Sequence, residues 1–158
     1  MTTASIQEVK KELRTLDPET VQELCMRLAK YKKENKELLS YLLFEAHDEP
    51  AYIESVKEEM RELFETIPDR NTYLIKKALR KILRITNKQI KYSGINQTEL
   101  ELRISFCTLV KDKKIPLQSS TVLSNLYRQQ LLKIKAILAK LPEDLQSDYD
   151  REIAYISK

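Results

Sequence analysis

The chain has 158 residues, of which 42% are hydrophobic and 33% charged, so its composition is not that of a disordered chain and it can bury a core. Its single glycine argues against a β-sheet protein, whose turns need glycine, and excludes P-loop and dinucleotide-binding fingerprints. The net charge of +4 is too mild to identify a partner by itself. The richness in Glu, Lys and Leu favours helices, so we expect an all-α protein with one domain over residues 1–158.

The first two helices have clear start signals. Ser5 and Glu8 form a capping box ahead of a short helix that should run to about Thr15. Asp17 followed by Pro18 then predicts the N-terminus of a second helix. That helix fades over residues 30–35, and its apolar stripe at helical spacing consists of Val21, Leu24, Cys25, Leu28 and Ala29.

The third and fourth predicted helices both have an apolar side, and the fourth also has an acidic side. Asn35 can cap a third helix, whose apolar positions are Leu38, Leu39, Leu42, Leu43 and Ala46. The segment 48–50, Asp-Glu-Pro, predicts the start of a fourth helix over residues 51–66. One side of this helix is apolar, with Tyr52, Val56, Met60, Leu63 and Ile67, and the opposite side is acidic, with Glu54, Glu58, Glu59, Glu62 and Glu65.

The stretch 70–98 is the most one-sided part of the chain, with eight basic residues and no acidic one. Its centre, residues 73–92, predicts a single long helix of about 30 Å around which we expect the other helices to pack. One half of its wheel is apolar, with Leu74, Ile75, Ala78, Leu79, Ile82, Leu83, Ile85 and Ile90. The other half is a basic stripe.

Three further helices complete the chain. Gly94 fits a left-handed C-terminal cap, and a sixth helix follows with Leu100, Ile104, Cys107 and Val110 on its apolar side. A seventh helix should run from residues 119–121 to about Lys140, and a last one should start after Pro142. We therefore expect about eight helices in antiparallel hairpins, arranged as an irregular α–α superhelix or, alternatively, as a globular multi-helix bundle.

The candidate catalytic and metal-binding residues are few. His47 is the only histidine, and it has neither a nucleophile motif nor a second His or Cys close in sequence. We therefore expect no enzyme activity, no metal and no cofactor. Cys25 and Cys107 both lie among apolar residues, which predicts buried free thiols. With no signal-peptide pattern and no long apolar run, the expected location is the cytoplasm, without a membrane contact.

Charge is distributed unevenly along the chain. Residues 1–69 carry a net charge of −6, residues 70–98 carry +8 and residues 99–158 carry +2. This pattern predicts a non-enzymatic interaction or scaffold domain that presents a basic helix face to an acidic protein partner. The alternative is a helical-repeat protein that contacts nucleic-acid phosphates without sequence specificity, and a third possibility is that the face only pairs with the acidic side of the fourth helix. The basic face consists of Arg70, Lys76, Lys77, Arg80, Lys81, Arg84, Lys88 and Lys91.

Overall fold

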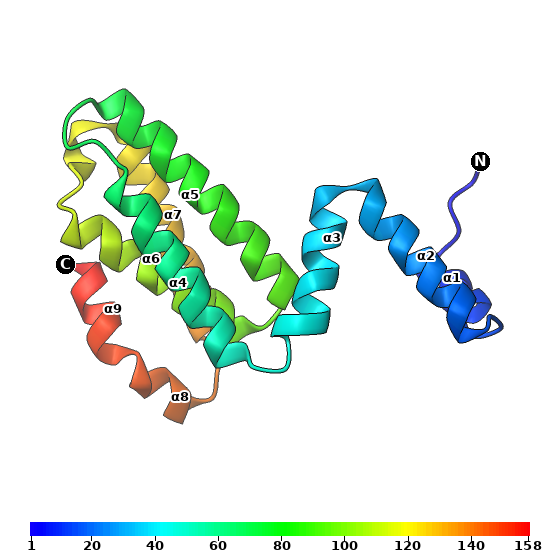
Figure 1. The fold of residues 1–158 in the computed structure, drawn as a ribbon. Helices are drawn as coiled ribbons and strands as arrows, with labels where there is room; N and C mark the ends of the chain where they lie inside the picture. The colour runs from blue at the N-terminus through cyan, green and yellow to red at the C-terminus, as the bar shows by residue number, and fades with distance from the viewer. The chain divides into compact units, whose positions relative to one another are not determined.

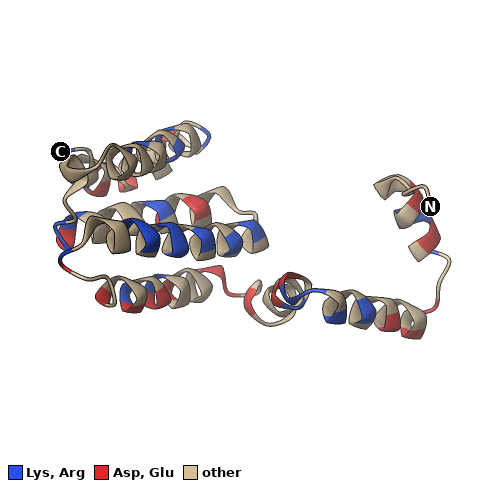
Figure 2. Ribbon diagram, turned by 90° about the horizontal axis from the view of Figure 1, so that it is seen from above, with Lys and Arg blue, Asp and Glu red and all other residues tan.

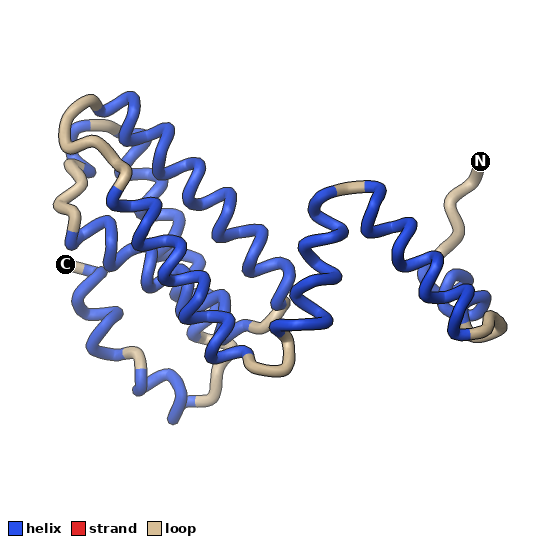
Figure 3. Tube along the Cα trace, in the orientation of Figure 1, coloured by secondary structure: helices blue, strands red, loops and turns tan.

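The structure, a computed structural model, describes all residues 1–158. It contains nine α-helices and no strand, which confirms the all-α expectation (Figures 1 and 3). The chain divides into two compact units, Met1–Phe44 and Glu45–Lys158, which we describe one at a time. That residues 1–158 act as one domain stays a prediction.

The N-terminal unit begins with α1 (Ile6–Leu13), α2 (Pro18–Tyr31) and α3 (Lys33–Ser40), and a π-helical turn, η1 (Tyr41–Glu45), follows α3. The Ser5 capping box is formed in both directions, and the Asp17 side chain accepts a hydrogen bond from the backbone N–H of Thr20. Helices α2 and α3 pack against each other (Figure 1). The first two start signals of the sequence are thus confirmed.

The start of α3 differs from the prediction. The helix begins at Lys33, and its N-cap residue, Lys32, makes no capping hydrogen bond. Asn35, the predicted cap, lies inside the helix and its Nδ2 instead donates to the carbonyl oxygen of Leu28, at 2.8 Å. Asn35 therefore caps the C-terminal end of α2, where carbonyl groups lack partners within their own helix.

The C-terminal unit contains six α-helices and a short 3₁₀ turn, η2 (Leu117–Ser119). The helices are α4 (Glu49–Glu65), α5 (Thr72–Ser93), α6 (Asn96–Asp112), α7 (Thr121–Leu138), α8 (Glu143–Asp148) and α9 (Asp150–Ser157). The expected last helix is thus interrupted at Tyr149, which ends α8 and precedes α9. This interruption accounts for the ninth helix.

Helix α6, and not α5, is the one around which the C-terminal unit is organised. It packs against α4, α5, α7 and α9 (Figure 1), and its buried residues cover most of its circumference. Our expectation that the other helices pack around the long basic helix is therefore wrong. Within this unit the helices form a bundle around α6. Its buried residues are Thr98, Leu100, Leu102, Arg103, Ile104, Phe106, Cys107 and Val110.

The two faces of α5 are close to those predicted. Ile75, Leu79, Ile82, Leu83 and Ile90 are buried, Ile85 is half-buried, and Leu74 is exposed. Thr86 takes a place in the buried face that the pattern did not assign to it. Its hydroxyl donates to the carbonyl oxygen of Ile82, at 2.9 Å, so this polar group is satisfied within the helix.

None of these helices combines the length and the apolar character that crossing a membrane requires.

Candidate binding face on helix α5

Helix α5 is fixed at both ends by residues suited to its caps. The Asn71 side chain accepts a hydrogen bond from the backbone N–H of Leu74, at 3.2 Å, and Gly94 ends the helix with φ at +68°. Positive φ is the region that glycine adopts without strain. With 22 residues the helix is about 33 Å long, so it holds its outer side chains in one straight row.

The structure brings the predicted basic residues together on one exposed side. Seven of the eight belong to α5, and the eighth, Arg70, lies in the turn before it. Lys76 and Lys88 are half-buried and the remaining six are exposed. In Figure 2 the corresponding ribbon positions follow one another along α5. We call this set, Arg70, Lys76, Lys77, Arg80, Lys81, Arg84, Lys88 and Lys91, the basic face.

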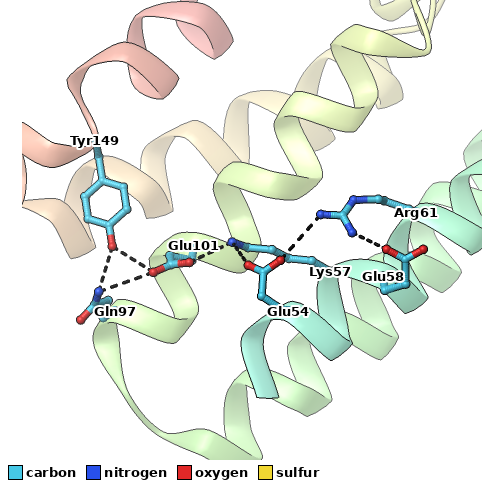
Figure 4. Close-up of polar contacts among 7 residues, drawn as sticks. All are labelled: Glu54, Lys57, Glu58, Arg61, Gln97, Glu101 and Tyr149. Carbon is cyan, nitrogen blue, oxygen red and sulfur yellow. Dashed lines mark hydrogen bonds and ion pairs between the residues drawn. The ribbon is translucent and has the colours of Figure 1, made fainter. Parts of the chain in front are cut away.

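The acidic side of α4 does not neutralise the basic face. The pairs that it forms are with basic residues of its own helix: Glu54 with Lys57, at 2.9 Å, and Glu58 with Arg61 (Figure 4). Lys88 aside, no side chain of the basic face lies within 4.0 Å of a carboxylate. The third possibility, pairing between the two neighbouring faces, is therefore not what the structure contains.

The basic side chains instead repel one another along the helix. Like charges four residues apart recur in series, at positions 76 and 80, 77 and 81, 80 and 84, and 84 and 88. Each such pair destabilises a helix by a few tenths of a kcal/mol. An anion that binds between these side chains removes part of this repulsion.

Two open hollows between the long side chains offer places for such an anion. The first is lined by Tyr73, Lys76, Lys77, Arg80, Lys81 and Arg84, and the second by Arg80, Leu83, Arg84, Asn87, Lys88 and Lys91. Arg80 and Arg84 border both hollows, so they form the centre of the basic face. A guanidinium group can hold a carboxylate or a phosphate through two parallel hydrogen bonds.

The sequence pattern missed the position of Tyr73. The basic face predicted from the sequence contains no aromatic residue, yet the Tyr73 side chain is 68% exposed and lines the first hollow beside the basic side chains. The signal was present in the sequence, because Tyr73 precedes Lys76 and Lys77 by about one helical turn. An aromatic ring therefore belongs to the candidate site.

A second polar cluster joins α4, α6 and the C-terminal helices (Figure 4). Lys57 Nζ lies 2.9 Å from both Glu54 and Glu101, and the Tyr149 hydroxyl lies 3.2 Å from Glu101. Burial lowers the pKa of Lys57, but the hydrogen bonds to the two carboxylates outweigh it, so this pKa is raised overall. Each of these groups has a partner inside the protein, so we assign the cluster to holding helices together.

The groups considered for metal binding or thiol chemistry are dispersed. His47 is exposed in the turn before α4, and no group of three or more His, Cys, Asp or Glu side chains is arranged to hold a metal ion. Both cysteines are free, and Cys107 is buried as expected. Burial raises the pKa of the Cys107 thiol to about 12. Cys25 is exposed, which corrects the prediction that it is buried.

Searches of known protein families, curated proteins and solved structures found nothing that matches this chain significantly.

Proposed function

We propose that the protein is a non-enzymatic helical interaction protein, whose basic face binds an acidic segment of a protein partner. The observation that supports this is the row of exposed Lys and Arg side chains on α5, which have no carboxylate partner inside the molecule apart from the case of Lys88. Acidic side chains of a partner would enter the two hollows between these residues. Binding would relieve repulsion between like charges and create new charge-assisted hydrogen bonds.

The composition of the first hollow favours a protein over a simple anion. Tyr73, which is 68% exposed, adds an aromatic surface beside the basic side chains. Protein interfaces draw most of their affinity from a few apolar or aromatic anchors, while surrounding charges set orientation and association rate. An acidic helix or strand with interspersed apolar residues matches this surface.

Nucleic acid is the second candidate, and the exposed Tyr73 ring supports it. A base could stack on this ring while Arg80 and Arg84 hold the phosphates on either side. Such a contact would position a strand without reading its sequence, since phosphates carry no sequence information.

The test is a fluorescence-anisotropy titration of the full chain with two labelled probes, a poly-glutamate peptide and a mixed-sequence oligonucleotide, single- or double-stranded. The variant Arg80→Glu/Arg84→Glu reverses the centre of the basic face. Its matched control is Arg128→Glu/Arg151→Glu, which makes the same charge change at two exposed positions on α7 and α9. We expect the peptide to bind the wild type and the control but not the basic-face variant.

The salt dependence separates the two candidates. Six or more phosphate contacts lose about 10³-fold in affinity between about 50 and 200 mM salt. Oligonucleotide binding that falls steeply with salt, is lost in Arg80→Glu/Arg84→Glu and is weakened about tenfold by Tyr73→Ala would favour nucleic acid over the acidic protein partner. If neither probe binds, or if both double variants lose binding equally, the basic face is not the binding site.

A further inference from the structure

The two hollows of the basic face repeat each other at a spacing of seven residues. Each of the six lining positions of the first hollow, moved seven residues along the chain, gives a lining position of the second. Seven residues are about two turns and about 10.5 Å of an α-helix, so the hollows lie on the same side of α5 and about that far apart. The basic residues that correspond in this way are Lys77 and Arg84, Lys81 and Lys88, and Arg84 and Lys91.

Each hollow contains a hole of the kind that receives a side chain from a neighbouring helix. When two helices pack side by side, a side chain of one enters a gap between four residues of the other, at positions i, i+3, i+4 and i+7. In the first hollow these four residues are Lys77, Arg80, Lys81 and Arg84. In the second they are Arg84, Asn87, Lys88 and Lys91. We call these two sets the first and the second basic hole.

Asn87, the one uncharged member of the two holes, also presents hydrogen-bond donors. Its Oδ1 accepts a hydrogen bond from Nη1 of the buried Arg103, at 3.2 Å. Because a guanidinium group carries only donors, the amide oxygen has to face Arg103, which leaves the Nδ2 hydrogens for another group. Arg103 is itself held by Glu99 and Gln130, so the orientation of the amide is fixed. Both holes therefore present donors only, and a carboxylate matches them.

The spacing of the two holes selects a helix over an extended strand. Along a strand, side chains on one face recur about every 6.8 Å, so no pair of them is about 10.5 Å apart. In an α-helix, residues seven apart lie on the same side and are separated by about 10.5 Å. The lag of about 20° over seven residues is taken up when two helices coil around each other. All residues that line the hollows belong to α5, so the partner contacts a single helix there.

We propose that the acidic partner binds as an α-helix that lies along α5, with acidic side chains seven residues apart entering the two basic holes. This inference rests on the proposed function, because it specifies the conformation and the charge pattern of the acidic segment. The Lys and Arg side chains around each hole donate to the entering carboxylate, and the repulsion between like charges along α5 falls.

The test compares two labelled peptides of about 21 residues and identical composition, long enough to form a helix. In the striped peptide, Glu occupies two positions of every heptad and forms one row along the helix. In the scrambled peptide the same residues are reordered so that no two Glu residues are seven apart. In fluorescence-anisotropy titrations of the full chain at about 50 mM salt, the striped peptide should bind about tenfold more tightly, because only it presents carboxylates to both holes at once. Its circular dichroism should become more helical on binding.

The contribution of the second basic hole is tested by Asn87→Asp. The new carboxylate can still accept from Arg103, but it removes the donors of the amide and adds a like charge, so the striped peptide should bind about tenfold more weakly. The matched control is Asn125→Asp on α7, since Asn125 is exposed and its Oδ1 also accepts from an arginine, Arg128, at 3.1 Å. The control should bind like the wild type, and circular dichroism checks that both variants are folded.

The outcomes separate this proposal from the proposed function. If both peptides bind equally well and both are lost in Arg80→Glu/Arg84→Glu, the face binds acidic segments but does not select a helix, and this proposal is wrong. A striped peptide that binds Asn87→Asp as tightly as the wild type would overturn the assignment of the second basic hole. If neither peptide binds, this proposal and the acidic protein partner both fail.

Discussion

Arg103 is the most buried charged side chain of the molecule, with 5% of its surface exposed, and it ties three helices together. Its Nε and Nη2 atoms lie 2.8 and 2.6 Å from one carboxylate oxygen of Glu99, also on α6. Its Nη1 donates to Gln130 of α7, at 2.8 Å, and to Asn87 of α5, at 3.2 Å. The guanidinium group thus satisfies polar atoms from both neighbouring helices inside the bundle.

Removal of this guanidinium should strongly destabilise the C-terminal unit. In Arg103→Met the Gln130 amide oxygen stays buried without its donor and Glu99 loses its partner, so we expect the free energy of unfolding to fall by about 3 kcal/mol. Urea unfolding followed by circular dichroism measures this change. Arg128→Met, at an exposed position on the same helix as Gln130, should change stability little. Equal losses in the two variants would show that the Arg103 network does not contribute as described.

The two cysteines should differ sharply in reactivity. Cys25 is exposed, whereas Cys107 is fully buried and its thiol has a pKa raised by burial to about 12. Because only the thiolate attacks a disulfide reagent, Cys107 should stay unreactive at a pH where an ordinary thiol is partly ionised. We expect one thiol to react with Ellman's reagent in the native protein and two in denaturant. Rapid reaction of both thiols without denaturant would contradict the burial of Cys107.

The raised pKa of Cys107 also determines the direction in which stability should change with pH. Since the thiol ionises at a lower pH in the unfolded chain than in the folded one, the stabilising contribution of protonated Cys107 is complete below the ordinary thiol pKa of 9.0. It declines as the pH rises above that value. The variant Cys107→Ser has no thiol at this position that could ionise. It should therefore lose less stability than the wild type between neutral and strongly alkaline pH.

At the scale of the element, α5 is the helix that the sequence describes best. Its bounds are within a residue of those predicted, because Asn71 and Gly94 are strong end signals and the apolar positions recur at helical spacing. The residues of the basic face were identified for the same reason. A pattern that depends on one helix alone can be recognised in the sequence without knowledge of the neighbouring helices.

Helix α6 shows what such a pattern does not contain. Its buried residues cover most of its circumference, so it has no single narrow apolar stripe, and the buried Thr98 and Arg103 resemble surface positions. Their partners, such as Gln130, come from other helices and are set only when the bundle forms. The pairs of Glu54 and Glu58 with their own helix, by contrast, follow from the spacing of three residues and were available from the sequence.

The two sides of α5 should respond oppositely to a negative charge. Ile82 is 2% exposed and belongs to the core, while the neighbouring Lys81 is exposed on the basic face. We expect Ile82→Asp to unfold the C-terminal unit, because a buried carboxylate without a partner is very costly. Lys81→Glu should keep the native helical spectrum and melt close to the wild type, since it also replaces one repulsive pair with an attractive one. Similar melting curves for the two variants would mean that the faces are assigned wrongly.

At the scale of the whole molecule, the hydrophobic core lies entirely in the C-terminal unit. Its buried residues extend from Met60 to Ile156, and the Tyr127 hydroxyl ties α7 to the last helix by donating to the carbonyl oxygen of Ile156, at 2.6 Å. The N-terminal unit, with two buried residues, has no comparable core. The two units should therefore differ in stability, since only the C-terminal unit has an extensive core of its own to hold it together.

A fragment of residues 45–158 tests this division. Because it retains the whole core, we expect it to be helical and to unfold cooperatively, with a free energy of unfolding within about 1 kcal/mol of that of the same unit in the full chain. Its melting temperature should not depend on protein concentration. If the fragment is unfolded, the core of the C-terminal unit needs residues 1–44, and the expectation that this unit is stable through its own packing is wrong.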